Sequence, residues 1–143
     1  MNLPRETIYA ALFARLAAIP TLVTTSRKLR HWSDVQPAEQ PALFQAQKNQ
    51  RGVVTTPGAP TKWTLPADVY LYAWAPDDQL PSSIINSLLD AVEAALVPDN
   101  PMTGKCTLGG LVEHVYLDGE IETDGGVLGN QAIAIIPINI VTT

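Results

Sequence analysis

The chain has 143 residues, 46% of them hydrophobic and 16% charged, with a formal net charge of -5. This size predicts one domain over residues 1–143, able to fold without a metal or a disulfide. The acidic balance argues against broad phosphate-backbone binding, and the single cysteine, Cys106, excludes an intramolecular disulfide and a multi-cysteine zinc site. No apolar run approaches the ~20 residues of a membrane-spanning helix, and residues 1–6 show no signal-peptide pattern, so we expect production in a cytoplasm.

The first third of the chain predicts a helix, a connector and a strand. Pro4 suits a first helical turn, and an apolar stripe at helical spacing follows, so residues 4–18 are expected to be helical. Residues 22–32 look extended, residues 34–41 form a turn-rich connector, and residues 42–48 form a strand. Three basic side chains in the extended part are interpreted as salt-bridged or solvated rather than phosphate-binding: Arg27, Lys28 and Arg30.

The segment 49–61 is expected to be a loop, because it is rich in glycine and proline. It is longer than most connections in compact domains, and such loops are often functional. Val53 and Val54 lie close to Arg51 in the sequence, which gives a short apolar contact surface beside a positive charge. We interpret these three residues as a candidate assembly element.

The next strand, expected over residues 62–75, places three aromatic residues on one face. Two interpretations stand: core packing, or a protein interface, since interface cores favour aromatic residues. A helix follows over residues 81–96, opened by a proline and two serines. The aromatic residues complete the candidate assembly interface, which comprises Arg51, Val53, Val54, Tyr70, Tyr72 and Trp74.

The end of the chain predicts two strands, 111–117 and 132–141, joined by a turn-rich loop in which Gly125-Gly126 makes a turn. The last strand is apolar on both faces, with Ile136, Ile138 and Ile140 on one and Ile133, Ile135 and Val141 on the other. Two helices can cover one face, so the other needs a loop or another copy of the protein. The predicted fold is α+β: a mixed, mostly antiparallel sheet of four to five strands packed with two helices.

Residues that could carry chemistry are few. His31 and His114, the only histidines, have the neighbours of sheet residues, and we expect both to be structural. The acidic series Asp118, Glu120, Glu122 and Asp124 either binds a hard cation or is a solvated strand end, and the second interpretation is preferred because the spacing does not fit a calcium loop. No helix follows Gly109-Gly110, so it is not a phosphate loop. We therefore predict no catalytic, cofactor-binding or metal-binding residue and no enzyme activity.

Five segments carry a resemblance to a known family: LRHWSDV at 29–35, PALFQ at 41–45, GGLVEHVY at 109–116, GEI at 119–121, and the isoleucine-rich end up to residue 138. Together they resemble the tail-terminator (tail-completion, minor tail) proteins of long-tailed bacteriophages. The resemblance implies a structural virion protein that forms a hexameric ring on the tail tube, ends tail polymerisation and provides the surface for head attachment. It implies no catalytic residue and no cofactor.

The resemblance also implies partners and a place in the particle. The expected partners are further copies of the chain, the tail tube protein and the head–tail connector proteins, with genomic DNA passing through the ring without sequence-specific binding. The expected location is the head-proximal end of the virion tail, after assembly in the host cytoplasm and without a membrane.

Two alternatives remain open. Another phage structural ring subunit, either a head–tail connector or a tail-tube protein, fits the same absence of catalytic motifs, although two well-formed helices weigh against a tube subunit. A small enzyme with a scattered site is the other alternative. It would need a pocket that joins His114 to carboxylates.

Overall fold

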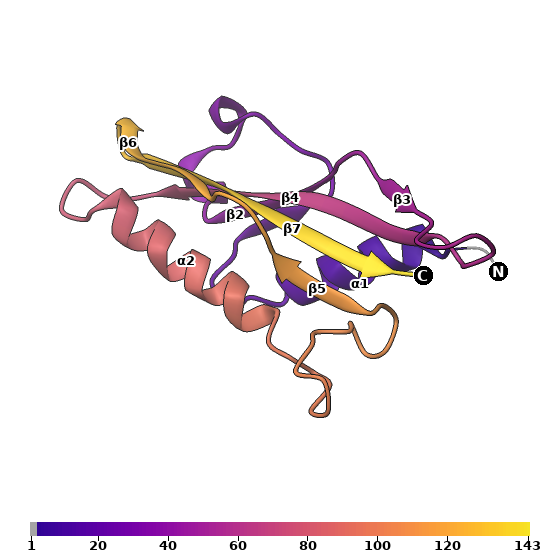
Figure 1. The fold of residues 1–143 in the computed structure, drawn as a ribbon. Helices are drawn as coiled ribbons and strands as arrows, with labels where there is room; N and C mark the ends of the chain where they lie inside the picture. The colour runs from indigo at the N-terminus through magenta and orange to yellow at the C-terminus, as the bar shows by residue number, and fades with distance from the viewer. Residues whose placement is uncertain (1–2) are drawn as a thin grey trace.

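A computed structural model of the chain describes residues 3–143, except the side chains of residues 126–128. Within this part, a seven-stranded sheet carries two α-helices (Figure 1). The sheet order is β1-β2-β4-β7-β5, with β3 added to β4 and β6 added to β7, and every pair except β1 with β2 is antiparallel. The elements are α1 (Arg5–Ala17), β1 (Thr24–Ser26), β2 (Ala42–Gln47), β3 (Arg51–Val53), β4 (Lys62–Trp74), α2 (Pro81–Ala95), β5 (His114–Leu117), β6 (Glu122–Leu128) and β7 (Gln131–Thr142).

The α+β class, the antiparallel character and both helices are confirmed, but the predicted count of four to five strands is wrong. β3 and β6 lie in segments expected to be loops, and Gly125-Gly126 belongs to β6 instead of forming a turn. Glycine and carboxylates disfavour strands in isolation. Here β4 and β7 are long enough to leave backbone groups for a further strand, and pairing with them overrides the local preference.

Both helices cover the same face of the sheet, as expected (Figure 1). Their apolar stripes pack on alternate residues of β4 and β7, where Leu71 and Ile138 are completely buried. The helix side of the sheet is also joined to α1 by hydrogen bonds. Gln45 Nε2 donates to the Tyr9 carbonyl at 3.0 Å, and the Tyr9 hydroxyl donates to the Pro66 carbonyl at 3.2 Å.

The opposite face, called the second face below, is covered only in part. A small core of Val35, Ala42, Phe44 and Tyr72 lies there, under the turn-rich segment 29–41. An ion pair within this segment, Arg30 Nη1 to Glu39 Oε2 at 2.9 Å, fixes its path. The segment covers the β2 side and leaves the β7 side half-exposed. Among the described residues, no helix combines the length and the apolarity needed to cross a membrane.

Candidate functional site

Two cross-strand rows of side chains build the second face. Because directly opposed residues of antiparallel strands share a face, the pairings of β2, β4, β7 and β6 align one side chain from each strand. The first row is Phe44, Tyr70, Ile135 and Glu122. The second row is Ala42, Tyr72, Ile133 and Asp124. Each row therefore runs from a buried residue of β2 to an acidic residue of β6.

A hollow of about 370 Å³, called the second-face groove below, lies between these rows and the turn-rich segment 29–41, called the covering segment below. Tyr70, Ile133 and Ile135 are half-buried in it, and the Trp32 and His31 rings stand 5.0 Å apart in its wall. Glu122 is exposed on the β6 side. The groove is lined by Leu29, Arg30, His31, Trp32, Tyr70, Tyr72, Ile133 and Ile135.

Tyr72 belongs to the floor of the groove. It is only 3% exposed, and its hydroxyl donates a 2.7 Å hydrogen bond to the Arg30 carbonyl. Burial raises the pKa of Tyr72 to about 12, with a smaller contribution from Tyr70. Of the two interpretations given to the aromatic stripe, core packing holds for Tyr72. Trp74, by contrast, is 40% exposed near the end of β4.

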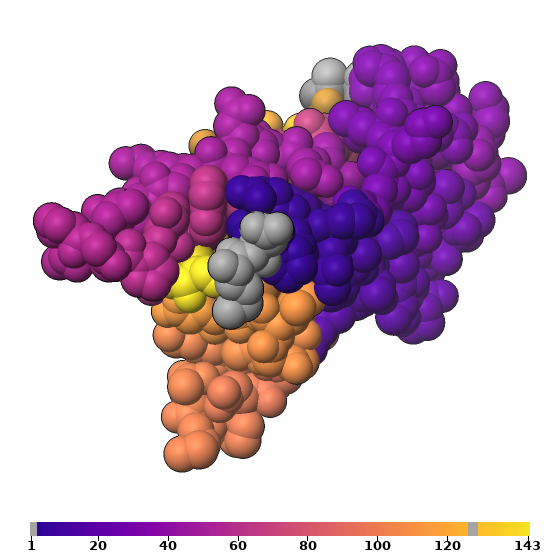
Figure 2. Space-filling view, turned by 90° about the vertical axis from the view of Figure 1, so that its right-hand side faces the viewer, coloured from indigo at the N-terminus to yellow at the C-terminus, as the bar shows by residue number. Residues whose placement is uncertain are grey.

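The other half of the candidate interface lies at the opposite end of β4. Val53 faces Lys62 in the β3–β4 pair, so residues 51–64 form a hairpin. Gly52 allows this close packing, because an added Cβ would lie 2.8 Å from Thr61 Cγ2 and 3.0 Å from the Trp63 ring, so one of these side chains would have to move. Figure 2 shows this part of the chain, in magenta, projecting from the body. Val53 is 42% exposed and Val54 is 54% exposed.

The candidate interface residues therefore form two patches. Along β4, Lys62 and Leu71 are separated by roughly 30 Å at the usual rise of about 3.3 Å per residue. Figure 1 likewise places β3 and β6 toward opposite ends of the sheet. No pattern in the sequence marks Leu29 or Trp32 as residues of this site. It did identify Ile133 and Ile135 as a face in need of cover, through the two-sided pattern of the last strand.

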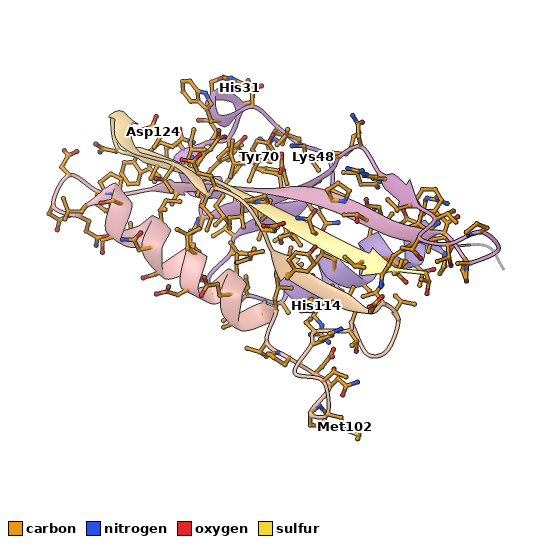
Figure 3. The ribbon with its side chains drawn as sticks, in the orientation of Figure 1. His31, Lys48, Tyr70, Met102, His114 and Asp124 are labelled. Atoms are coloured by element: carbon orange, nitrogen blue, oxygen red, sulfur yellow. The ribbon has the colours of Figure 1, made fainter. Side chains whose placement is uncertain are left out.

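The histidines are far apart (Figure 3). His31 Nδ1 accepts a hydrogen bond from the Ser33 amide at 3.2 Å. His114 stacks on Tyr116 with ring centroids 5.0 Å apart, and its buried Nδ1 has no hydrogen-bond partner among the described residues. Across residues 3–143, where side chains are described, no three His, Cys, Asp or Glu side chains converge as metal ligands would.

The basic residues and the cysteine are engaged in structural contacts. Arg27 pairs with Glu6 at 2.6 Å, and Arg30 pairs with Glu39, which confirms the salt-bridge interpretation for both. Cys106 is buried and contacts a basic residue that is remote in the sequence. Arg15 Nη1, 91 positions away in the chain, donates to its Sγ at 3.4 Å.

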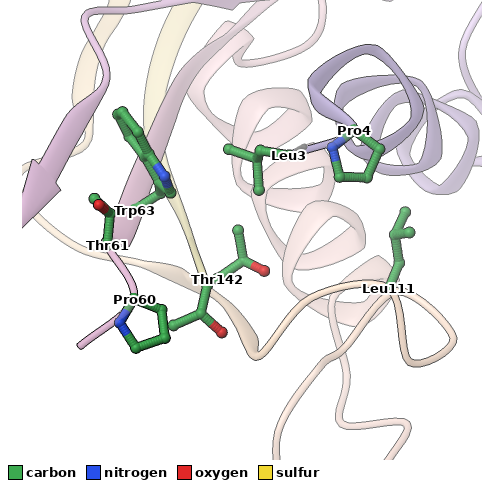
Figure 4. A pocket seen from close by; sticks show the side chains of 8 residues that line it. Leu3, Pro4, Pro60, Thr61, Trp63, Leu111 and Thr142 are labelled. Carbon is green, nitrogen blue, oxygen red and sulfur yellow. The ribbon is translucent and has the colours of Figure 1, made fainter. Parts of the chain in front are cut away.

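Two further hollows offer little chemistry. One, of about 690 Å³, lies beside Trp63 near both ends of the described chain, and its side-chain polar groups are threonine hydroxyls and the Trp63 indole N–H (Figure 4). The other, of about 610 Å³, contains Lys48 and Asp68, which form an ion pair at 3.3 Å, together with Asp118. Neither includes His114, so neither brings that ring to a carboxylate.

The chain matches no protein-family model and no curated protein. Solved structures do share its fold. A chain of the "Virion of native gene transfer agent (GTA) particle" aligns with a TM-score of 0.53 at 8% identity, over 92% of this chain and 91% of that chain. A second solved structure, named only by a sequence identifier, aligns with a TM-score of 0.54 at 17% identity, over 99% and 98% of the two chains. At these identities the likeness establishes a common fold.

Proposed function

We propose that this chain is a structural protein of a phage-like virion, which caps the tail tube as a hexameric ring. In that position it ends tail polymerisation and provides the surface for head attachment. The resemblance to tail terminators over residues 29–138 supports this proposal. The shared fold with a chain of a gene transfer agent virion supports the virion part of it.

The observation that carries the proposal is the half-covered second face. Ile133 and Ile135 lie beside Tyr70 in an apolar groove that the covering segment leaves open. Removing apolar surface from water contributes about 25 cal/mol of favourable free energy per Å², so such a groove favours association. In a ring, each subunit contacts two neighbours through two different patches.

The proposed neighbours of the ring are the tail tube protein on one side and the head–tail connector proteins on the other. Genomic DNA passes through its centre. A chain with net charge -5, whose Arg27 and Arg30 are already paired with carboxylates, offers few free cations to retain phosphates. Such a surface suits passage of DNA without sequence-specific binding.

Electron microscopy of the purified protein, combined with a mass measurement over a range of concentrations, tests the proposal. We expect closed rings with the mass of six chains, and the same rings at one end of tail tubes when both are mixed. A monomer at every concentration, with no ring at any tube end, contradicts it. Long filaments instead of rings also contradict capping, and favour the tail-tube alternative.

A further inference from the structure

We propose that the β3–β4 hairpin of one copy docks into the second-face groove of the next copy, head to tail. This inference rests on the proposed function, because it assumes that copies of the chain assemble. It assigns the two halves of one contact. The hairpin supplies Val53, Val54 and Arg51, and the groove supplies Tyr70, Ile133 and Ile135 with Glu122 on its β6 side.

The positions of the two patches decide that the contact forms between copies. Both lie on β4, the hairpin at its start and the groove near its end, roughly 30 Å apart at about 3.3 Å per residue. β4 is a continuous strand paired with β7 along its length, so it cannot fold back to bring the hairpin to its own groove. A contact between unlike patches at opposite ends of a subunit is the head-to-tail kind that closes rings.

The two patches are both apolar and both partly exposed. Val53 and Val54 are among the exposed large hydrophobic residues, on a hairpin whose β3 strand is fixed to β4 by backbone pairing. The groove of about 370 Å³ is open to solvent beside half-buried aromatic and aliphatic side chains. A hairpin already ordered loses little conformational freedom on docking.

Charge complementarity favours a second copy as the occupant. The Arg51 side chain is exposed and makes no hydrogen bond or ion pair with the described residues, and the same holds for the Glu122 side chain. Glu122 stands in the same cross-strand row as Ile135, so it borders the place where the valines dock. Arg30, the cation in the groove wall, is paired with Glu39 and is therefore less able to repel an incoming Arg51.

Charge reversal tests the contact. Arg51→Glu gives a chain whose hairpin and groove are both acidic, and Glu122→Arg gives one in which both are basic. Each variant alone should self-associate roughly tenfold or more weakly than the original chain, measured by sedimentation velocity. An equimolar mixture should recover association, because every hairpin then meets a groove of opposite charge. A hexamer, having an even number of subunits, can close with the two variants alternating.

Matched controls use exposed charges that lie outside both patches. Lys28→Glu and Glu120→Arg make the same charge changes and should leave association unchanged. Melting temperatures of all variants should match that of the original chain, because the mutated side chains have no partner among the described residues. Variants that stay folded, associate normally alone and show no recovery on mixing would overturn the inference.

Cross-linking gives an independent readout. Val54→Cys and Ile135→Cys chains, mixed with an oxidant such as oxidised glutathione, should form a disulfide-linked pair. Cys106 is buried and serves as an internal control, and Val23→Cys, at a position 61% exposed, should not cross-link to Ile135→Cys. If rings form without the Val54–Ile135 cross-link, the inference is wrong but the proposed function is not contradicted. If the original chain forms no rings either in solution or on tails, the proposed function itself is contradicted.

Discussion

Arg15 in α1 and Asp99 in the loop after α2 are joined by a 2.6 Å hydrogen bond between Arg15 Nη2 and Asp99 Oδ2. The same carboxylate accepts hydrogen bonds from the Gly109 amide at 3.0 Å, the Thr107 amide at 2.7 Å and the Thr107 hydroxyl at 2.8 Å. Asp99 therefore connects two segments that lie 84 positions apart in sequence. One carboxylate fixes the loop that leads into β5.

Because of this arrangement, the stability of the fold depends on pH. The Gly109 and Thr107 amides, then the Thr107 hydroxyl and Arg15, hold the pKa of Asp99 well below its usual range. A lowered carboxyl pKa stabilises the fold at neutral pH, and that contribution is lost as the pH falls below about 4. We expect Asp99→Asn to lower the melting temperature by several degrees at pH 7, with the difference shrinking toward pH 2.

Thermal melts of both chains between pH 2 and 8 measure this effect. Asp90→Asn is a suitable control, because Asp90 is exposed on α2 and its carboxylate makes no hydrogen bond or ion pair with a described residue. It should melt like the original chain throughout. A difference between the original chain and Asp99→Asn that is equally large at pH 2 would show that the charge of Asp99 is not the cause.

Alkaline pH should lower the stability of the fold through Tyr72. Its pKa is raised to about 12 by burial, so the unfolded chain ionises first, at about pH 10, and stability falls as the pH rises further. Tyr72→Phe loses the hydrogen bond to the Arg30 carbonyl, which costs about 1 kcal/mol at pH 7. Urea unfolding at pH 7 and pH 11 should show this cost shrinking at pH 11. A cost that grows with pH would argue against a buried, neutral Tyr72.

Ile138 tests the main core. Its side chain is completely buried between β7 and the helices, and a carboxylate there has no partner. Burying an isoleucine contributes about 1.5–3 kcal/mol, and an unpaired buried charge costs more than that. Ile138→Asp should give insoluble or unfolded protein, assayed by solubility and thermal melting. Val23→Asp places the same charge at a 61% exposed position and should remain folded. A cooperatively melting Ile138→Asp chain would contradict the assignment of this face.

His114 tests whether an enzymatic centre exists. We expect His114→Ala to fold, with a loss of about 0.5–1.5 kcal/mol from the lost stacking on Tyr116. It should also form rings and complete tails as well as the original chain. His114→Phe, which restores a stacking ring without a titratable nitrogen, should recover the stability. A folded His114→Ala protein that lost a measurable catalytic turnover would overturn the structural role.

The hairpin loop should be dispensable for folding. Residues 54–61 can be replaced by Asn-Gly, which joins Val53 to Lys62 in a two-residue turn and retains β3. Loop closure entropy depends weakly on length, so the melting temperature should change little, while ring formation weakens because Val54 is lost. Thr55→Ser with Thr56→Ser keeps the valine and should associate normally. If the shortened chain unfolds, the loop packs within its own subunit; if it still completes tails, the loop is a passive connector.

Periodicity in the sequence was sufficient for the elements that form the core. The apolar stripe that includes Leu16 predicts α1, and the alternation around Tyr70 and Ile138 predicts β4 and β7, because each pattern matches the geometry of its own backbone. β3 and β6 were missed for the opposite reason. Arg51-Gly52-Val53 and Glu122-Thr123-Asp124 become strands only because a long neighbour offers them hydrogen bonds.

For the candidate site too, local pattern predicts some features and only the tertiary structure decides others. The two-sided pattern of β7 established that Ile133 and Ile135 need cover, since alternation assigns each residue to a face. Tertiary structure alone decided how much cover they receive. Tyr70, Tyr72 and Trp74 share one strand face, yet Tyr72 is buried under the turn-rich segment while Trp74 is exposed beyond it. Exposure depends on where a remote segment comes to rest, and local alternation carries no information about that position.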